Sequence, residues 1–176
     1  MKLDFTGVSA GGFTVLPSGR YRVKVDYVNY YIKEETGNPV FFFNLEVTEG
    51  EYKGSTVGMF KAYTEKVGSR GALLSILATL GIITEDDRDD KGVLEVGVKF
   101  GGTDDRGYTE VKAFVTANGE ERSPEGATAV AVVSKRKEGE RESNTVDRLE
   151  ADSSAPDALA GGEKADQGQS SIEDIW

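Results

Sequence analysis

The chain has 176 residues, a formal net charge of −10, and neither cysteine nor histidine. These two absences exclude a disulfide framework, a Cys- or His-ligated metal centre, and catalysis by a Cys nucleophile or a His base. No apolar run approaches the roughly 20 residues that span a bilayer, and the N-terminal residues lack the apolar core of a signal peptide. We therefore expect a soluble, cytoplasmic protein.

Charge and aromatic residues divide the chain into two unequal parts. Residues 1–137 carry 18 basic and 20 acidic side chains, whereas residues 138–176 carry 3 and 11. Of the 16 aromatic residues, 15 lie at or before Phe114. An acidic segment poor in apolar residues cannot bury enough surface to offset its loss of conformational entropy. We expect a folded domain over 1–117, an extension or linker over 118–137, and a disordered acidic tail over 138–176.

The first predicted element is a long strand over residues 20–33, in which polar and apolar residues alternate. Its apolar positions are odd-numbered up to Tyr27 and even-numbered from Val28 onward. This change of face predicts a bulge or a sharp coil within the strand. A strongly curved strand that serves both halves of a small barrel requires such an irregularity.

One helix is predicted, over residues 69–80, where leucines recur on one face. Ser69 is a suitable N-cap and Gly81 a suitable residue just past the last turn. Residues 85–90 form an acidic loop, and residues 126–133 fit a strand or a short helix equally well. The remaining predicted strands cover residues 40–47, 55–63, 92–100 and 108–117.

The order of these elements, β-β-β-α-β-β, indicates a mainly β fold. Five short strands with a helix between the third and the fourth match the oligonucleotide/oligosaccharide-binding (OB) fold, a five-stranded Greek-key barrel. An open α+β sheet with the same order of elements is the alternative. In the apolar registers we assign five aromatic residues to the core: Tyr21, Tyr27, Phe41, Phe43 and Phe100.

Other aromatic residues exceed what the core needs. Phe42 shares a strand face with polar residues, and the adjacent Tyr30 and Tyr31 must point to opposite faces. Phe60 and Tyr63 flank a lysine. Exposed rings stack on nucleobases without reading sequence, and neighbouring cations neutralise phosphates. The candidate single-stranded DNA-binding residues are Arg20, Arg22, Lys24, Tyr30, Tyr31, Lys33, Phe42, Phe60, Lys61, Tyr63, Lys66 and Arg70.

Two features leave a more ordinary interpretation open. The surplus rings could instead pack beneath loops or form a dimer interface. The net charge of residues 1–137, which is −2 (18 basic against 20 acidic), also differs from the basic charge usual in nucleic-acid binders.

The chain ends with a bulky ring and a carboxylate after acidic residues. A shallow apolar pocket rimmed by cations on a partner protein can capture such an ending. The alternative is a solvated tail with one hydrophobic residue. The candidate partner-binding residues are Glu173, Asp174, Ile175 and Trp176.

Three short motifs carry a resemblance to a known family: Leu-Asp-Phe at 3–5, Leu-Pro-Ser-Gly-Arg-Tyr at 16–21 and Glu-Gly-Glu-Tyr-Lys-Gly at 49–54. Over residues 1 to about 117 the chain resembles a phage-encoded family, long filed as of unknown function and now regarded as single-stranded DNA-binding proteins. The tail independently resembles the acidic, aromatic-ended tails of bacterial and phage single-strand binding proteins.

The resemblance implies an OB-fold barrel that coats exposed strands, without sequence specificity, during phage replication or recombination in the cytoplasm of the infected host. It also implies recruitment of replication proteins, such as a polymerase, primase or helicase, through the tail. Homo-oligomerisation is compatible with the sequence and stays open.

We expect no catalytic residue, no metal and no cofactor. The carboxylates within 85–90 lack the spacing of a calcium loop, so we interpret them as a solvated acidic loop. Two alternative functions remain. One is an acidic DNA mimic or host-enzyme inhibitor, and the other is a scaffold that binds proteins alone.

Overall fold

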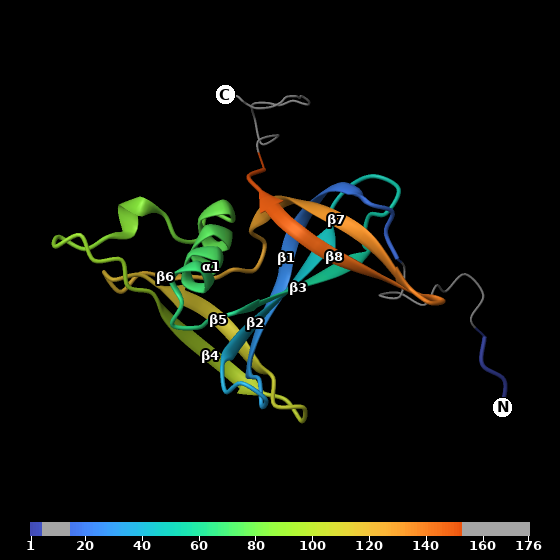
Figure 1. Ribbon diagram of the computed structural model, residues 1–176, viewed down its shortest axis with the longest axis horizontal. Helices are drawn as coiled ribbons and strands as arrows, with labels where there is room; N and C mark the ends of the chain where they lie inside the picture. The colour runs from blue at the N-terminus through green and yellow to red at the C-terminus, as the bar shows by residue number, and fades with distance from the viewer. Residues whose placement is uncertain (5–14, 153–176) are drawn as a thin grey trace.

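The computed structural model describes residues 1–4 and 15–152 (Figure 1). Within these residues the fold is mainly β, with antiparallel strand pairs, one α-helix and a short 3-10 helix. No helix in this part of the chain is long and apolar enough to cross a membrane. In chain order the elements are β1 (Gly19–Ile32), β2 (Pro39–Val47), β3 (Thr56–Ala62), α1 (Val67–Thr79), the 3-10 helix η1 (Glu85–Asp87), β4 (Gly97–Thr103), β5 (Thr109–Val115), β6 (Glu121–Arg122), β7 (Thr128–Glu138) and β8 (Arg141–Glu150).

The long strand β1 organises the sheet. One of its edges pairs with β2, which in turn pairs with β3. Its other edge is shared: residues 19–24 pair with β7, and residues 29–30 pair with β5 of the β4–β5 hairpin. β8 pairs with β7 and lies beside β3. In Figure 1 the β7–β8 hairpin (orange) and the β4–β5 hairpin therefore leave β1 in different directions.

The predicted irregularity in the first strand is confirmed. The register of β1 against β2 shifts between Val25 and Tyr27. Because the shift falls before Tyr27 and not after it, Val28 enters the core and Tyr27 is turned outward, with 42% of its surface exposed. The assignment of Tyr27 to the core was therefore wrong.

The core lies between the inward faces of the strands and α1. Phe43 is fully buried and Phe41 is nearly so, as their alternation in β2 predicts. Tyr21 is half-buried and packs against the core, where its ring meets the edge of Tyr52. Phe100 was expected in the core but is 45% exposed. It lies in β4 at a point where the register of β4 against β5 is irregular.

The helix begins earlier than predicted. Its N-cap is Lys66, which makes no side-chain capping bond, so the assignment of Ser69 as N-cap was wrong. The Ser69 hydroxyl instead donates to the carbonyl of Ala62 and accepts from the amide of Thr64, which fixes the turn that leaves β3. At the other end Gly81 has a φ of +74°, as a residue just past a helix requires.

The expected linker and the first part of the expected disordered tail are in fact folded. Residues 128–138 and 141–150, assigned to a linker and a disordered tail, form the paired strands β7 and β8. Val133 and Val146 are buried in the core, so the folded part extends well past residue 117. Pairing with β7 and burial of one face beside β3 override the polar composition of β8.

The interpretation of residues 85–90 as a solvated acidic loop is wrong for Asp87. Asp87 is buried, and both of its carboxylate oxygens accept bonds of 2.8 Å from the Arg122 guanidinium. Arg122 also donates to the carbonyl of Ile82 at 2.9 Å. Thr84 and Asp87 form a reciprocal cap on η1. This ion pair ties η1 to β6.

Candidate functional site

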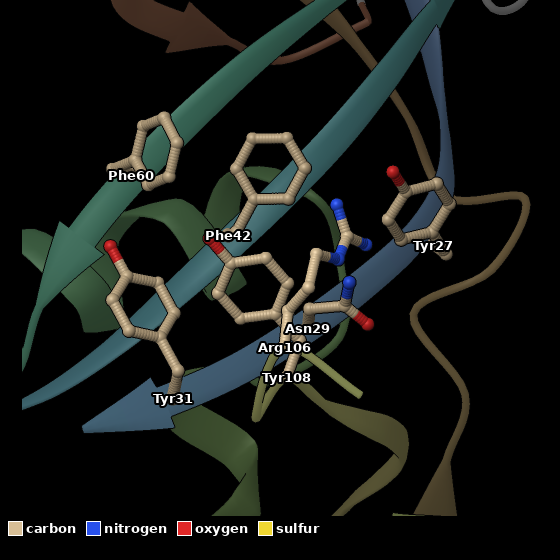
Figure 2. Close-up of a pocket in the computed structure, with 7 residues that line it drawn as sticks. All are labelled: Tyr27, Asn29, Tyr31, Phe42, Phe60, Arg106 and Tyr108. Atoms are coloured by element: carbon tan, nitrogen blue, oxygen red, sulfur yellow. The ribbon is translucent and has the colours of Figure 1, made fainter. Parts of the chain in front are cut away.

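An open groove of about 220 Å³ lies on the outward face of the sheet, over β1, β2 and β3 (Figure 2). We call it the aromatic groove. Five of its seven lining side chains are aromatic. The lining residues are Tyr27, Asn29 and Tyr31 from β1, Phe42 from β2, Phe60 from β3, and Arg106 and Tyr108 from the turn between β4 and β5.

Strand alternation builds most of this surface. After the register shift, residues 27, 29 and 31 point to the same outward side of β1. Phe42 is paired with Asn29 on one side and with Phe60 on the other. Three neighbouring strands thus place one row of side chains across the sheet.

The rings are close enough to form a continuous stacking surface. The centroids of Phe42 and Phe60 are 4.6 Å apart, and those of Tyr27 and Phe42 are 6.1 Å apart. Tyr31 and Tyr108 meet at 5.0 Å on the other side of the groove. Phe60 and Tyr27 are 58% and 42% exposed, so these rings lie in contact with solvent and are accessible to a ligand.

Gly58 makes room for the central ring. A Cβ atom at this position would lie 2.4 Å from Cε1 of Phe42, closer than real contacts allow. The ring of Phe42 therefore lies against the backbone of β3. Glycine within a strand is unfavourable unless a side chain or ligand approaches the backbone closely, and here Phe42 does so.

Asp104 shapes the turn that closes the groove. Its Oδ1 accepts from the backbone amides of Arg106, at 2.9 Å, and Tyr108, at 3.0 Å. Its Oδ2 accepts from the Arg106 side chain at 3.1 Å. The amide of Tyr108, assisted by Arg106, holds the pKa of Asp104 below its usual range, so this carboxylate is ionised at neutral pH.

Arg106 and Tyr108 form the polar rim. The Arg106 guanidinium lies 4.9 Å from the centre of the Tyr108 ring, a cation–π contact. Burial raises the pKa of Tyr31, with smaller contributions from Tyr108 and Glu35, so its hydroxyl stays neutral. The groove thus combines aromatic rings with one exposed arginine, whose guanidinium also pairs with Asp104 at 3.1 Å at the rim.

Three predicted aromatic residues meet in the groove: Tyr31, Phe42 and Phe60. Tyr30 lies on the opposite face of β1, where its ring packs against Phe41 at 5.4 Å and Phe100 at 4.8 Å. Of the adjacent tyrosines, Tyr31 is the one that leaves the core. Tyr63 is exposed just beyond β3 and does not line the groove.

The predicted cations do not line the groove. Arg20 pairs with Glu150, and Arg22 pairs with Glu49 at 2.9 Å and with Asp152 at 3.2 Å. Acidic side chains therefore pair with both arginines of the basic face of β1. The remaining predicted cations are exposed or partly exposed outside the groove: Lys24, Lys33, Lys61, Lys66 and Arg70.

Sequence reasoning missed four of the lining residues. It placed Tyr27 in the core, and Asn29 carried no signal beyond its register. Arg106 and Tyr108 belong to the segment Asp-Asp-Arg-Gly-Tyr at 104–108, which reads as an acidic turn. A cation beside an aromatic residue at the start of a strand was the available signal.

The partner-binding residues, Glu173 to Trp176, lie outside the described residues. Among the residues that the structure does describe, no group of acidic side chains is arranged to hold a metal ion.

Comparison with known proteins gives a family but no activity. A family model described as "Protein of unknown function (DUF669)" matches residues 1–127. That span includes β1 to β6 and every residue of the aromatic groove. No curated protein matches the chain.

Proposed function

Because the chain belongs to the DUF669 family, whose function is not established, we propose from the groove itself that it binds single-stranded DNA without sequence specificity. The observation that carries the proposal is the row of exposed rings across β1, β2 and β3, with Arg106 beside it. Stacking of a base on such a ring contributes about 1–3 kcal/mol and is tolerant of base identity.

Single strands suit this surface better than a duplex. Bases of a duplex are stacked on one another, and their faces are closed to Phe42 and Phe60. Unpaired bases can turn onto the rings, while Arg106 lies within the same groove to contact a phosphate. The open shape of the groove lets a continuous strand pass through it.

The strand arrangement supports an OB-type barrel as part of this proposal. The meander β1–β2–β3 is followed by α1, β7 pairs with β1, and β8 lies beside β3. In that reading the last two barrel strands are β7 and β8. The β4–β5 hairpin is then an insertion that supplies the rim of the groove.

We further propose coating of exposed strands during phage DNA replication or recombination. The family resemblance seen in the sequence supports this setting. Recruitment of replication proteins by Glu173 to Trp176 stays a prediction from sequence.

A protein-only scaffold is the second candidate, because exposed rings also suit a protein partner. The rings lie in a hollow beside a cation, which favours nucleotides over a flat protein surface. A DNA mimic is less well supported, because the groove face presents rings and Arg106 in place of regularly spaced carboxylates.

The test is a fluorescence-polarisation titration with labelled oligo-dT and with a duplex of equal length, over a range of salt concentrations. Variants Phe42→Ala and Phe60→Ala remove the central rings of the groove. Phe100→Ala is the matched control, because this exposed phenylalanine lies outside the groove.

We expect the native chain to prefer oligo-dT, and each groove variant to bind it at least about fivefold more weakly, in line with the loss of one stacked base. Phe100→Ala should bind normally. Absence of oligo-dT binding at low salt, or equal binding to the duplex, would contradict the proposal.

A further inference from the structure

Asn29 is out of place as a strand residue. It lies in the second half of β1, between Tyr27 and Tyr31 on the outward face, and it is half-buried. Asparagine is depleted in strands, where β-branched and aromatic residues are favoured. A residue that breaks a local preference needs a compensating contact or a function.

No contact inside the protein provides that compensation. Within residues 1–4 and 15–152 the Asn29 carboxamide forms no hydrogen bond. The neighbouring Asn44 differs, because its Nδ2 donates to Asp26 at 3.3 Å. In Figure 2 the Asn29 side chain lies among the residues that line the groove.

We propose that Asn29 hydrogen-bonds the pairing edge of a base that stacks on the groove rings, and that this contact selects unpaired bases. The inference rests on the proposed function and deepens it. Phe42, directly opposite Asn29 in the register, supplies the ring beneath the base.

The chemistry of the carboxamide fits this role. Its oxygen accepts and its nitrogen donates, side by side in one plane. Thymine can donate N3–H to Oδ1 and accept from Nδ2 at O4. The other three bases also carry an adjacent donor and acceptor on their pairing edges, so the contact tolerates any sequence.

The same contact discriminates against a duplex. In paired DNA these donors and acceptors are occupied by the complementary base, so Asn29 would have no partner. A carboxamide that loses its water to a bound strand and gains no bond in return is costly, which turns one hydrogen bond into a preference for single strands.

The test uses two oligonucleotides of equal length, one of thymidine and one of N3-methylthymidine. Methylation removes the N3–H donor and leaves the ring free to stack. The variant is Asn29→Val, because valine suits a strand and cannot hydrogen-bond. Asn44→Ala is the matched control, an outward-facing asparagine of β2 that lies outside the groove lining. Thermal unfolding checks that each variant is folded.

We expect the native chain and Asn44→Ala to bind the methylated strand about tenfold more weakly, the effect of one lost hydrogen bond with an unsatisfied partner. Asn29→Val should bind both strands equally. If the native chain binds both strands equally, or Asn29→Val still discriminates, the role of Asn29 is wrong while single-strand binding stands. If the native chain binds neither strand, the proposed function itself fails.

Discussion

Two residues set the geometry of the groove without themselves offering a ring or a cation. Gly58 lets the ring of Phe42 lie against β3, and Asp104 holds the turn that presents Arg106 and Tyr108. Substitution at either position therefore tests the shape of the groove separately from its chemical groups.

Gly58→Ala should weaken oligo-dT binding by about five- to tenfold, because its Cβ displaces the Phe42 ring on which a base stacks. Crowding of this kind also lowers the free energy of unfolding by about 1–3 kcal/mol. Fluorescence polarisation and urea unfolding measure the two effects. Gly102→Ala in β4 is the control, since nothing lies within 4 Å of its added Cβ. Unchanged binding by Gly58→Ala would show that the position of Phe42 is unimportant.

Arg106→Ala should weaken binding and reduce the salt dependence. Loss of one phosphate contact lowers the slope of log K against log salt by about 0.7 for a single strand. Arg88→Ala, which removes an exposed arginine paired with Glu85 outside the groove, should leave the slope unchanged. An unaltered slope for Arg106→Ala would place the phosphate contact elsewhere.

The sequence predicted some of the residues that line the groove, because strand alternation is a local pattern. Phe42 followed from alternation, because it shares a strand face with polar residues. Alternation also required one of Tyr30 and Tyr31 to point outward, without selecting which. Tyr27 was misplaced because a bulge shifts facing by one residue, and the sequence locates a bulge only approximately. Arg106 and Tyr108 depend on the β4–β5 hairpin returning to β1, a long-range pairing that local patterns do not contain.

At the scale of elements, the first three strands and the helix were predictable and the last two strands were not. Strands β1 to β3 alternate strongly and carry half of the 16 aromatic residues. In β8, Val146 is the one buried side chain among mainly charged and polar neighbours. The composition of β8 is therefore typical of a disordered tail. The pairing with β7, and not composition, makes it a strand.

Truncation after residue 137 should therefore destabilise the protein strongly compared with truncation after residue 152. The shorter chain loses β8, uncovers Val133, and loses the two bonds between Asn144 and the backbone of Leu16. Each uncovered aliphatic side chain costs about 1.5–3 kcal/mol. Urea unfolding followed by circular dichroism compares the two truncations. Equal stability would contradict the assignment of β8 to the core.

At the scale of the whole molecule, one ion pair joins segments far apart in the chain. Arg122 in β6 holds Asp87 and the carbonyl of Ile82, which anchors the connection after α1 to the β5–β6 region. Bonds from Arg122, then from the Thr84 amide, hold the pKa of Asp87 below its ordinary value. The pair therefore links stability to pH.

The direction of the pH dependence of stability follows from the lowered pKa of Asp87. Asp87 stabilises the fold fully above its unfolded pKa of about 4, and this contribution is lost as pH falls through the lower folded value. The native chain should lose stability below about pH 4 more steeply than Asp87→Asn, which should be less stable at pH 7. Thermal unfolding from pH 3 to pH 7 measures both. Parallel pH profiles would show that Asp87 does not contribute.

The central claim, that bases stack on the rings of the aromatic groove, is tested most directly by photo-cross-linking. A single strand containing 5-iododeoxyuridine is bound to the full chain, irradiated, and the attached residues are identified by mass spectrometry. We predict cross-links at Tyr27, Tyr31, Phe42, Phe60 or Tyr108. Cross-links confined to aromatic residues elsewhere, such as Tyr52, Tyr63 or Phe100, would contradict the account.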